Sequence, residues 1–260
     1  MELYFERWGD TGPPLLILHG LFGSSRNWRS IGRRLAENRR VYAVDQRNHG
    51  KSFHTSALDY AVLADDVREF VDKHGIGPVA VVGHSMGGKV AATLALESPN
   101  RVTHLVVVDV TPLRRVTDAR AALDALLSTN VSTCASRQEV DQRLAAMVPD
   151  ARTRSFLLTN LERDEDGAFA WRVNLPAIDA HFDEIAAPIG ARVTFEGPAL
   201  FVNGGRSEHL RSTDRTSIRE VFLRAEFVEV EEAGHWVHAD APETFVGVVG
   251  GFLSRPTRSE

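Results

Sequence analysis

One short stretch of the chain has the residues and the spacing of an enzymatic nucleophile. Residues 79–96 read VAVVGHSMGGKVAATLAL, in which a β-branched strand leads through Gly83, Ser85 and Gly87 into an Ala/Leu-rich helix. The glycines relieve crowding in a tight turn that lifts the serine hydroxyl to the N-terminus of the helix. A glycine-rich turn that only links strand to helix is the alternative. The flanking pattern favours Ser85 as a nucleophile.

A second stretch could supply the hydrogen-bond donors that acyl transfer needs. Residues 15–25, LLILHGLFGSS, predict a strand that ends in a sharp turn. Two backbone N–H groups must point at the developing oxyanion, and the usual pair comes from such a loop and from the residue after the nucleophile. We predict Leu21 and Met86 as these donors, with Phe22 as the other choice in the loop. His19 is interpreted as a structural hydrogen-bonding residue.

The segment AGHWVHADAPETF (233–245) places a histidine after the last predicted strand. The general base for the serine comes last in chain order in an architecture of this kind, and His235 fits that position. His238 leads into the helix after Pro242 and is interpreted as packing or solvent-facing. The other eight of the ten histidines lack metal-ligand spacing, so we expect neither a metal site nor a cofactor.

The elements that must position these residues alternate between strands and helices. Residues 60–75 place an apolar stripe on one helical face and end at Gly75. Continuous β-branched runs suit strands that are buried on both faces of a parallel sheet. The alternation therefore predicts an α/β fold with a mostly parallel central sheet flanked by helices. The predicted strands lie at residues 15–20, 41–46, 79–85, 104–110, 199–205 and 226–235.

The alternation stops between about residues 111 and 198, where the pattern becomes helical. Ser136 and Glu139 have the spacing of a capping box, and apolar residues on one helical face follow them. Because this insertion starts after one core strand and ends before another, it should cover the carboxyl edge of the sheet, where ligands bind. We predict a single domain, with a core of residues 1–110 and 199–260 and a helical cap over about 111–198.

The composition favours a small, neutral or apolar partner. The chain has 260 residues, of which 25% are charged, and its net charge of −5 provides no field that gathers nucleic acid or anionic lipid. The single cysteine, Cys134, cannot form an internal disulfide. The apolar runs are too short to cross a bilayer, and the start, MELYFERWGD, does not resemble a targeting signal. We expect a cytoplasmic protein that binds neither nucleic acid nor membrane.

These motifs together resemble the α/β-hydrolase family, over essentially all of the chain outside the cap. The similarity rests on DQRNHGKS, GHSMGGK, VVDVTP, WRVNLPAI and AGHWVHAD, which look like the small esterase and thioesterase branch that includes the α/β-hydrolase-domain-11-type proteins and their bacterial relatives. Asn48 and His49 narrow the branch, because many hydrolases have a glycine after the arginine. Asp45, Arg47 and His49 are interpreted as a hydrogen-bonded loop that supports the site.

The resemblance also bears on the carboxylate that must orient His235. In this fold the acid can follow either of two neighbouring strands, and its usual position in ALFVNGGRSEHL (199–210) is occupied by Ser207. The other strand, HLVVVDV, ends at Asp109, and relatives with a similar serine are thought to take their acid from it. We predict Asp109 as the acid. Glu208 is the alternative acid, and capping of the first cap helix is the alternative role for Asp109.

The predicted function is a serine hydrolase that acts on small to medium acyl esters or thioesters through a Ser-His-Asp triad and an acyl-enzyme. Phe22 and Trp236 lie beside the catalytic elements and are predicted substrate contacts. Three other functions use the same triad and stay open. They are a ligand receptor with slow hydrolysis, a cofactor-free haloperoxidase and a carbon–carbon bond hydrolase.

Overall fold

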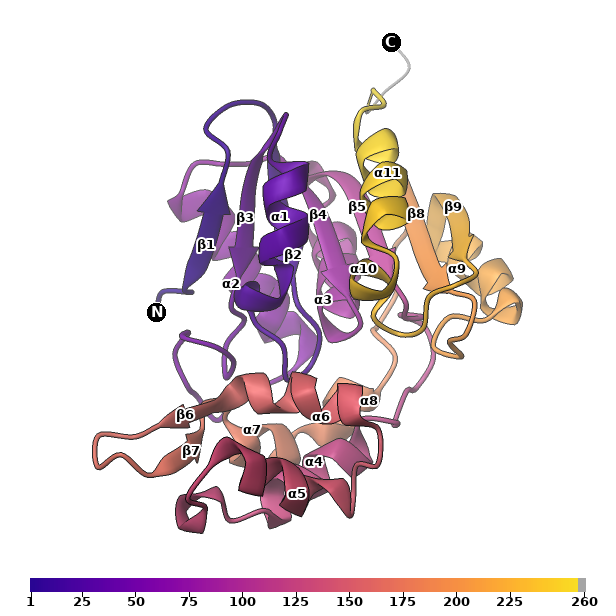
Figure 1. Ribbon diagram of the computed structural model, residues 1–260. Helices are drawn as coiled ribbons and strands as arrows, with labels where there is room; N and C mark the ends of the chain where they lie inside the picture. The colour runs from indigo at the N-terminus through magenta and orange to yellow at the C-terminus, as the bar shows by residue number, and fades with distance from the viewer. Residues whose placement is uncertain (257–260) are drawn as a thin grey trace.

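A seven-stranded sheet forms the centre of the computed structural model, which describes residues 1–256 (Figure 1). The strand order is β1-β3-β2-β4-β5-β8-β9, and every neighbouring pair is parallel except β1 with β3. The predicted α/β fold with a mostly parallel sheet is confirmed. The strands are β1 (Phe5–Trp8), β2 (Pro14–Leu18), β3 (Arg40–Val44), β4 (Val79–His84), β5 (Val102–Val108), β8 (Phe195–Gly204) and β9 (Phe222–Val230).

Helices cover both faces of the sheet, which explains why β4 and β5 are apolar along almost their whole length. One face carries α2 (Tyr60–Lys73), α3 (Met86–Glu97) and α9 (Arg215–Val221); the other carries α1 (Arg29–Leu35), α10 (Val237–Asp240) and α11 (Pro242–Leu253). The predicted helix at 60–75 is α2, and its apolar stripe is buried. No helix within residues 1–256 is long and apolar enough to span a bilayer.

The segment between β5 and β8 forms a layer at one end of the sheet (Figure 1). Its helices begin as the side-chain caps direct: Ser136 Oγ accepts the N–H of Glu139 at 3.2 Å. The Glu139 carboxylate bonds the N–H of Ala135 at 2.8 Å, one residue before the position that the capping box predicts. The layer contains α4 (Arg120–Ser128), α5 (Arg137–Ala145), α6 (Ala151–Leu157), α7 (Leu175–Ala180), α8 (Phe182–Ala186) and an unpredicted hairpin of β6 (Leu161–Arg163) and β7 (Phe169–Trp171).

Polar contacts join this layer, which we call the cap, to the core. Asn174 donates its backbone N–H to the carbonyl oxygen of Asn48 and its side-chain amide to Asn48 Oδ1, both at 2.9 Å. The buried Lys89 of α3 donates to the carbonyl oxygen of Ala187, just beyond α8, at 2.6 Å. Two motifs that were noted from the sequence, DQRNHGKS and WRVNLPAI, are therefore the two halves of one contact between core and cap.

Candidate active site

Ser85 stands at a strained turn between β4 and α3. Its backbone has φ 53° and ψ −119°, a left-handed conformation that is uncommon for a residue with a side chain. A Cβ at Gly83 would lie 2.1 Å from the carbonyl oxygen of Gly87, and a Cβ at Gly87 would lie 2.4 Å from that of Leu18. Both glycines are therefore required by close backbone approach, as the spacing of the motif predicts.

The loop after β2 lies against this turn. A Cβ at Gly20 would lie 3.2 Å from the Cβ of Ser85, so Gly20 lies directly against the serine. Leu21 and Phe22 are the next two residues of this loop. Phe22 has φ 61°, and its carbonyl oxygen accepts a hydrogen bond from the side-chain amide of Asn160 in the cap at 2.7 Å. The cap thus holds this loop at the peptide that directly follows the predicted oxyanion donors, Leu21 and Phe22.

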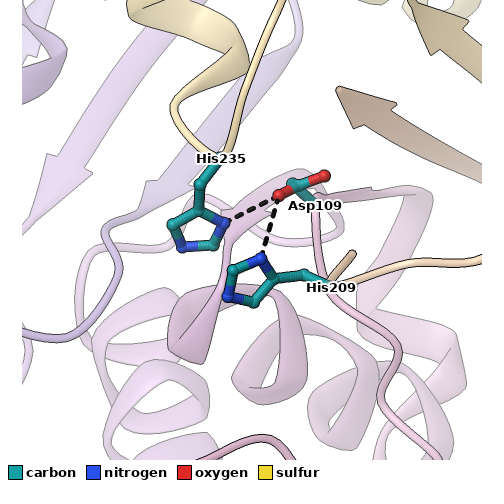
Figure 2. A group of neighbouring side chains, drawn as sticks. All are labelled: Asp109, His209 and His235. Carbon is teal, nitrogen blue, oxygen red and sulfur yellow. Dashed lines mark hydrogen bonds and ion pairs between the residues drawn. The ribbon is translucent and has the colours of Figure 1, made fainter. Parts of the chain in front are cut away.

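His235 and Asp109 form a hydrogen-bonded pair at the carboxyl edge of the sheet (Figure 2). His235 Nδ1 lies 2.7 Å from Asp109 Oδ2, and Asp109 is fully buried with φ 50° directly after β5. The carboxylate also accepts the N–H of Gly204 at 3.0 Å and the hydroxyl of Ser207 at 2.5 Å. Three donors thus satisfy a carboxylate that has no contact with solvent.

The segment that carries His235 is held in place from two sides. His84, the residue before Ser85, donates its Nε2–H to the carbonyl oxygen of His235 at 2.8 Å. Asp240 accepts the N–H of Gly234 at 2.7 Å and forms an ion pair with Arg152 of the cap helix α6. The position of the histidine therefore depends on both the core and the cap.

Glu208, the alternative acid, points away from His235. Its side chain is 82% exposed and forms an ion pair with Arg211 at 3.0 Å. The neighbouring Ser207 turns inward and its hydroxyl bonds Asp109. The structure thus brings the carboxylate of Asp109, and not that of Glu208, to the histidine.

His209 is part of this cluster, and the sequence reasoning did not identify it. Its ring stacks on that of His235 with centroids 3.9 Å apart and an interplanar angle of 23°. His209 Nδ1 lies 3.0 Å from Ser207 Oγ, and its Nε2 bonds the Asp118 carboxylate. Burial lowers the pKa of His209, but the hydrogen bond to Asp118 and the charges of Asp118 and Asp109 outweigh it, so the pKa is raised. Only its place two residues after Ser207 could have drawn attention to it.

Asp109, His209 and His235 place three potential metal-ligating atoms within 4.8 Å of one another. The lone pair of an imidazole nitrogen lies in the plane of its ring, and a bound ion must lie about 2 Å along it. Two rings that are stacked at 3.9 Å and inclined by only 23° cannot aim both Nδ1 lone pairs at one ion. The arrangement fits two histidines that share a carboxylate rather than a metal centre.

The loop after β3 supports the site from the core side, as interpreted from the sequence. His19 accepts the N–H of Gln46 at its Nε2 (3.0 Å), and Asp45 accepts the N–H groups of Ser25 and Lys51. Another histidine, His238 of α10, packs its ring on that of Trp28 with centroids 4.1 Å apart, which agrees with its interpretation as a packing residue. The residues Arg47 and His49 are likewise bound within the core, to the Asp66 carboxylate and to the Arg47 carbonyl oxygen respectively.

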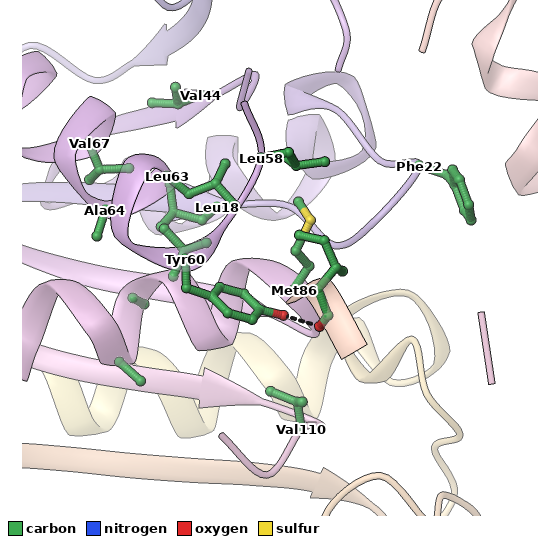
Figure 3. Packing of buried hydrophobic residues seen from close by; sticks show 14 of the residues in the cluster. Leu18, Phe22, Val44, Leu58, Tyr60, Leu63, Ala64, Val67, Met86 and Val110 are labelled. Atoms are coloured by element: carbon green, nitrogen blue, oxygen red, sulfur yellow. Dashed lines mark hydrogen bonds between the residues drawn. The ribbon is translucent and has the colours of Figure 1, made fainter. Parts of the chain in front are cut away.

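A cavity of about 330 Å³ lies between the sheet edge and the cap. Its lining is largely apolar, and Phe156 of the cap packs against Trp236 with centroids 5.3 Å apart. Met86 lies among core side chains, close to Tyr60, whose hydroxyl donates to the Ile185 carbonyl oxygen at 2.6 Å (Figure 3). The predicted residues on the lining are Leu21, Phe22, Ser85, His235 and Trp236, and the cap adds Asp118, Phe156 and Leu157.

Comparison with known proteins gives consistent matches. Residues 13–136 match the family model described as the alpha/beta hydrolase fold. The chain is 38% identical to the sn-1-specific diacylglycerol lipase ABHD11 of Danio rerio, over 96% of this chain and 80% of that protein. It is 29% identical to the Esterase YbfF of Escherichia coli, over 93% of each chain. The solved structure of a marine microorganism esterase superposes with a TM-score of 0.95 at 37% identity, over 97% of this chain and 99% of that one.

Proposed function

The chain belongs to the α/β-hydrolase family, and from this premise we propose that it hydrolyses carboxylic esters or thioesters with Ser85 as nucleophile, His235 as general base and Asp109 as the orienting acid. Its relatives include esterases and a lipase, which supports hydrolase activity of the esterase type. The observation that carries the assignment of residues is the 2.7 Å bond from His235 Nδ1 to the buried Asp109, because His235 and Ser85 line the same cavity.

The chemistry follows from these positions. The Ser85 hydroxyl attacks the carbonyl carbon while His235 Nε2 takes its proton, and the Leu21 and Met86 N–H groups bind the oxyanion. His235 then donates that proton to the leaving alcohol or thiol, which departs and leaves an acyl group on the serine. Water repeats the sequence, and its addition releases the acid and restores the hydroxyl. Asp109 keeps the Nδ1–H of His235 in place and stabilises the imidazolium in both halves.

The shape of the cavity favours small to medium acyl groups. Phe22, Trp236, Phe156 and Leu157 give it apolar walls, and its volume of about 330 Å³ lies at the lower end of ordinary ligand pockets. We propose that the acyl chain lies between the Phe22 loop and α6. A panel of p-nitrophenyl esters from acetate to palmitate, together with acyl-CoA thioesters, would locate the preferred chain length and leaving group.

The nucleophile is tested by Ser85→Ala, with Ser254→Ala as the control because that hydroxyl lies on the surface at the end of α11. We expect Ser85→Ala to lose about 10⁶-fold in kcat with the fold retained, and organophosphate to label only proteins with Ser85. Activity that persists in Ser85→Ala, or labelling at another residue, would overturn the proposal. If the wild-type protein transferred one acyl group per molecule and then stopped turning over, it would be a ligand receptor and not an enzyme.

A further inference from the structure

Figure 2 shows a second histidine, His209, directly beside His235 and Asp109, and this histidine bonds a carboxylate of its own, that of Asp118. Asp118, in the cap segment between β5 and α4, bonds His209 Nε2, and His209 Nδ1 is 3.0 Å from Ser207 Oγ. Ser207 Oγ in turn is 2.5 Å from Asp109 Oδ2, the atom that bonds His235. The contacts form a continuous path from a carboxylate of the cap to the proposed base.

The number of protons on this path is fixed by its hydrogen bonds. A serine hydroxyl has one proton, and at 2.5 Å from a carboxylate the Ser207 proton must be donated to Asp109. His209 Nδ1 must then donate to Ser207 Oγ, because two lone pairs would otherwise face each other at 3.0 Å. His209 Nε2 faces the Asp118 carboxylate, which only accepts. Both ring nitrogens of His209 therefore carry protons.

We propose that His209 is a positioning residue for the hydrolysis and that it works as an imidazolium. Held by Asp118, it donates to Ser207, so that the Ser207 proton is directed to Asp109 and the carboxylate oxygen beside His235 is fixed. This inference rests on the proposed function, because it assigns a role on the acid side of the same site. It also adds a residue of the cap, Asp118, to the groups on which the triad depends.

The charged groups around His209 favour the cation. Asp118 bonds it from the cap segment, and Asp109 Oδ2 lies 3.6 Å from its Nδ1 at the end of β5. Arg114 opposes these carboxylates: its guanidinium donates to the His209 carbonyl oxygen at 3.4 Å, but its own ion pair with Asp214 offsets its charge. The remaining titratable group that faces His209 is His235, whose ring stacks on the His209 ring.

Loss of the His209 proton has a definite consequence for the reaction. A neutral His209 that keeps its Nε2–H on Asp118 turns Nδ1 into an acceptor, which competes with Asp109 for the Ser207 proton. Asp109 then loses a donor, and the orientation of His235 is weakened. The activity of the wild-type protein should therefore fall at alkaline pH as His209 loses its proton.

The kinetic test compares Asp118→Asn with Asp124→Asn, whose carboxylate also lies in the cap and pairs with Arg120 on the surface. Asp118→Asn removes the main group that holds the proton on His209, so the alkaline fall in kcat should move to lower pH. Asp124→Asn should leave the profile unchanged. His209→Phe retains a ring that can stack on His235 but cannot donate, so it should have a lower kcat and no alkaline fall of this origin.

A direct test observes the ring nitrogens of His209 by ¹⁵N NMR of the histidine-labelled protein, assigned by comparison with His209→Phe. Both nitrogens should be protonated at pH 7 and remain so above the ordinary histidine pKa of about 6.5. One unprotonated nitrogen at pH 7, or an unchanged titration in Asp118→Asn, would overturn the inference. Because this measurement needs no substrate, it distinguishes failure of the inference from failure of the proposed hydrolase activity.

Discussion

The carboxyl ends of β5 and β8 lie side by side in the sheet, but they supply different groups to the same site. The two strands pair in parallel up to Val108 and Val202. Asp109 directly follows β5, and its carboxylate bonds His235. The last residue of β8 and the loop after it contribute donors to that carboxylate instead, the N–H of Gly204 and the hydroxyl of Ser207.

The difference shows that the buried carboxylate of Asp109 depends on both strand ends. Asp109 is fully buried, so each of its oxygens needs donors from the protein, and β8 is the neighbour that provides them. A serine at position 207 is short enough to donate to the carboxylate without displacing it. The adjacent Glu208 side chain is left to the surface.

Exchange of the Asp109 carboxylate and the Ser207 hydroxyl should have the largest effect on kcat among the variants at these two strand ends. Asp109→Ser should reduce kcat by about 10² to 10⁴, because the imidazolium loses its carboxylate. Adding Ser207→Asp should return at least about tenfold of that loss, since Ser207 Oγ already lies 2.5 Å from the oxygen that bonds His235. Turnover of one p-nitrophenyl ester, with circular dichroism as the check on folding, measures both. A folded double variant that is no more active than Asp109→Ser would show that the two strand ends are not interchangeable.

Removal of the Ser207 hydroxyl should have a smaller effect, because the carboxylate stays in place. Ser207→Ala should lower the free energy of unfolding by about 1.5–3 kcal/mol, the range for a hydrogen bond to a charged group, and kcat by about tenfold. Urea unfolding and ester turnover measure the two losses. Ser217→Ala is the control, since that hydroxyl donates to the uncharged Asp214 carbonyl oxygen at 2.9 Å. Equal losses in both variants would mean that the bond to Asp109 has no special weight.

Much of the core could be predicted from the sequence, because its signals are local. The β-branched runs became strands, and the glycine spacing around Ser85 was sufficient to locate the turn. Asp109 could be chosen because Ser207 stood where an acid was expected. The contact of Asp118 with His209 could not be found in this way, since it joins residues 91 positions apart that are brought together only by the cap. The hairpin of β6 and β7 was missed because its strands have only three residues each.

Two buried histidines that follow β2 and β3, His19 and His49, contrast with His209 and His235 because neither bonds a carboxylate. Burial lowers the pKa of His19 to about 4 and that of His49 to about 3. The unfolded chain therefore binds more protons than the folded one below pH 6.5, and the free energy of unfolding should fall as the pH drops toward 4, by up to about 1.4 kcal/mol per pH unit for each histidine. The raised pKa of His209 acts in the opposite sense, because its stabilising contribution is lost as the pH rises through the folded-state pKa.

This pH dependence can be measured by urea unfolding between pH 7 and pH 4. His49→Gln should reduce the slope of the free energy of unfolding against pH by about one proton equivalent. His54→Gln, which changes an exposed histidine in the same loop region, is the matched control. A slope that His49→Gln leaves unchanged would show that His49 is not held neutral in the folded protein.

The central claim, that the acid comes from β5, is tested most directly by the kcat of Asp109→Asn and Glu208→Gln on one p-nitrophenyl ester. Asp109→Asn keeps the shape of the side chain but offers His235 the wrong partner, so kcat should fall by at least about 10². Glu208→Gln removes only an exposed ion pair and should stay within about twofold of the wild type. A nearly wild-type Asp109→Asn together with a crippled Glu208→Gln would contradict the account.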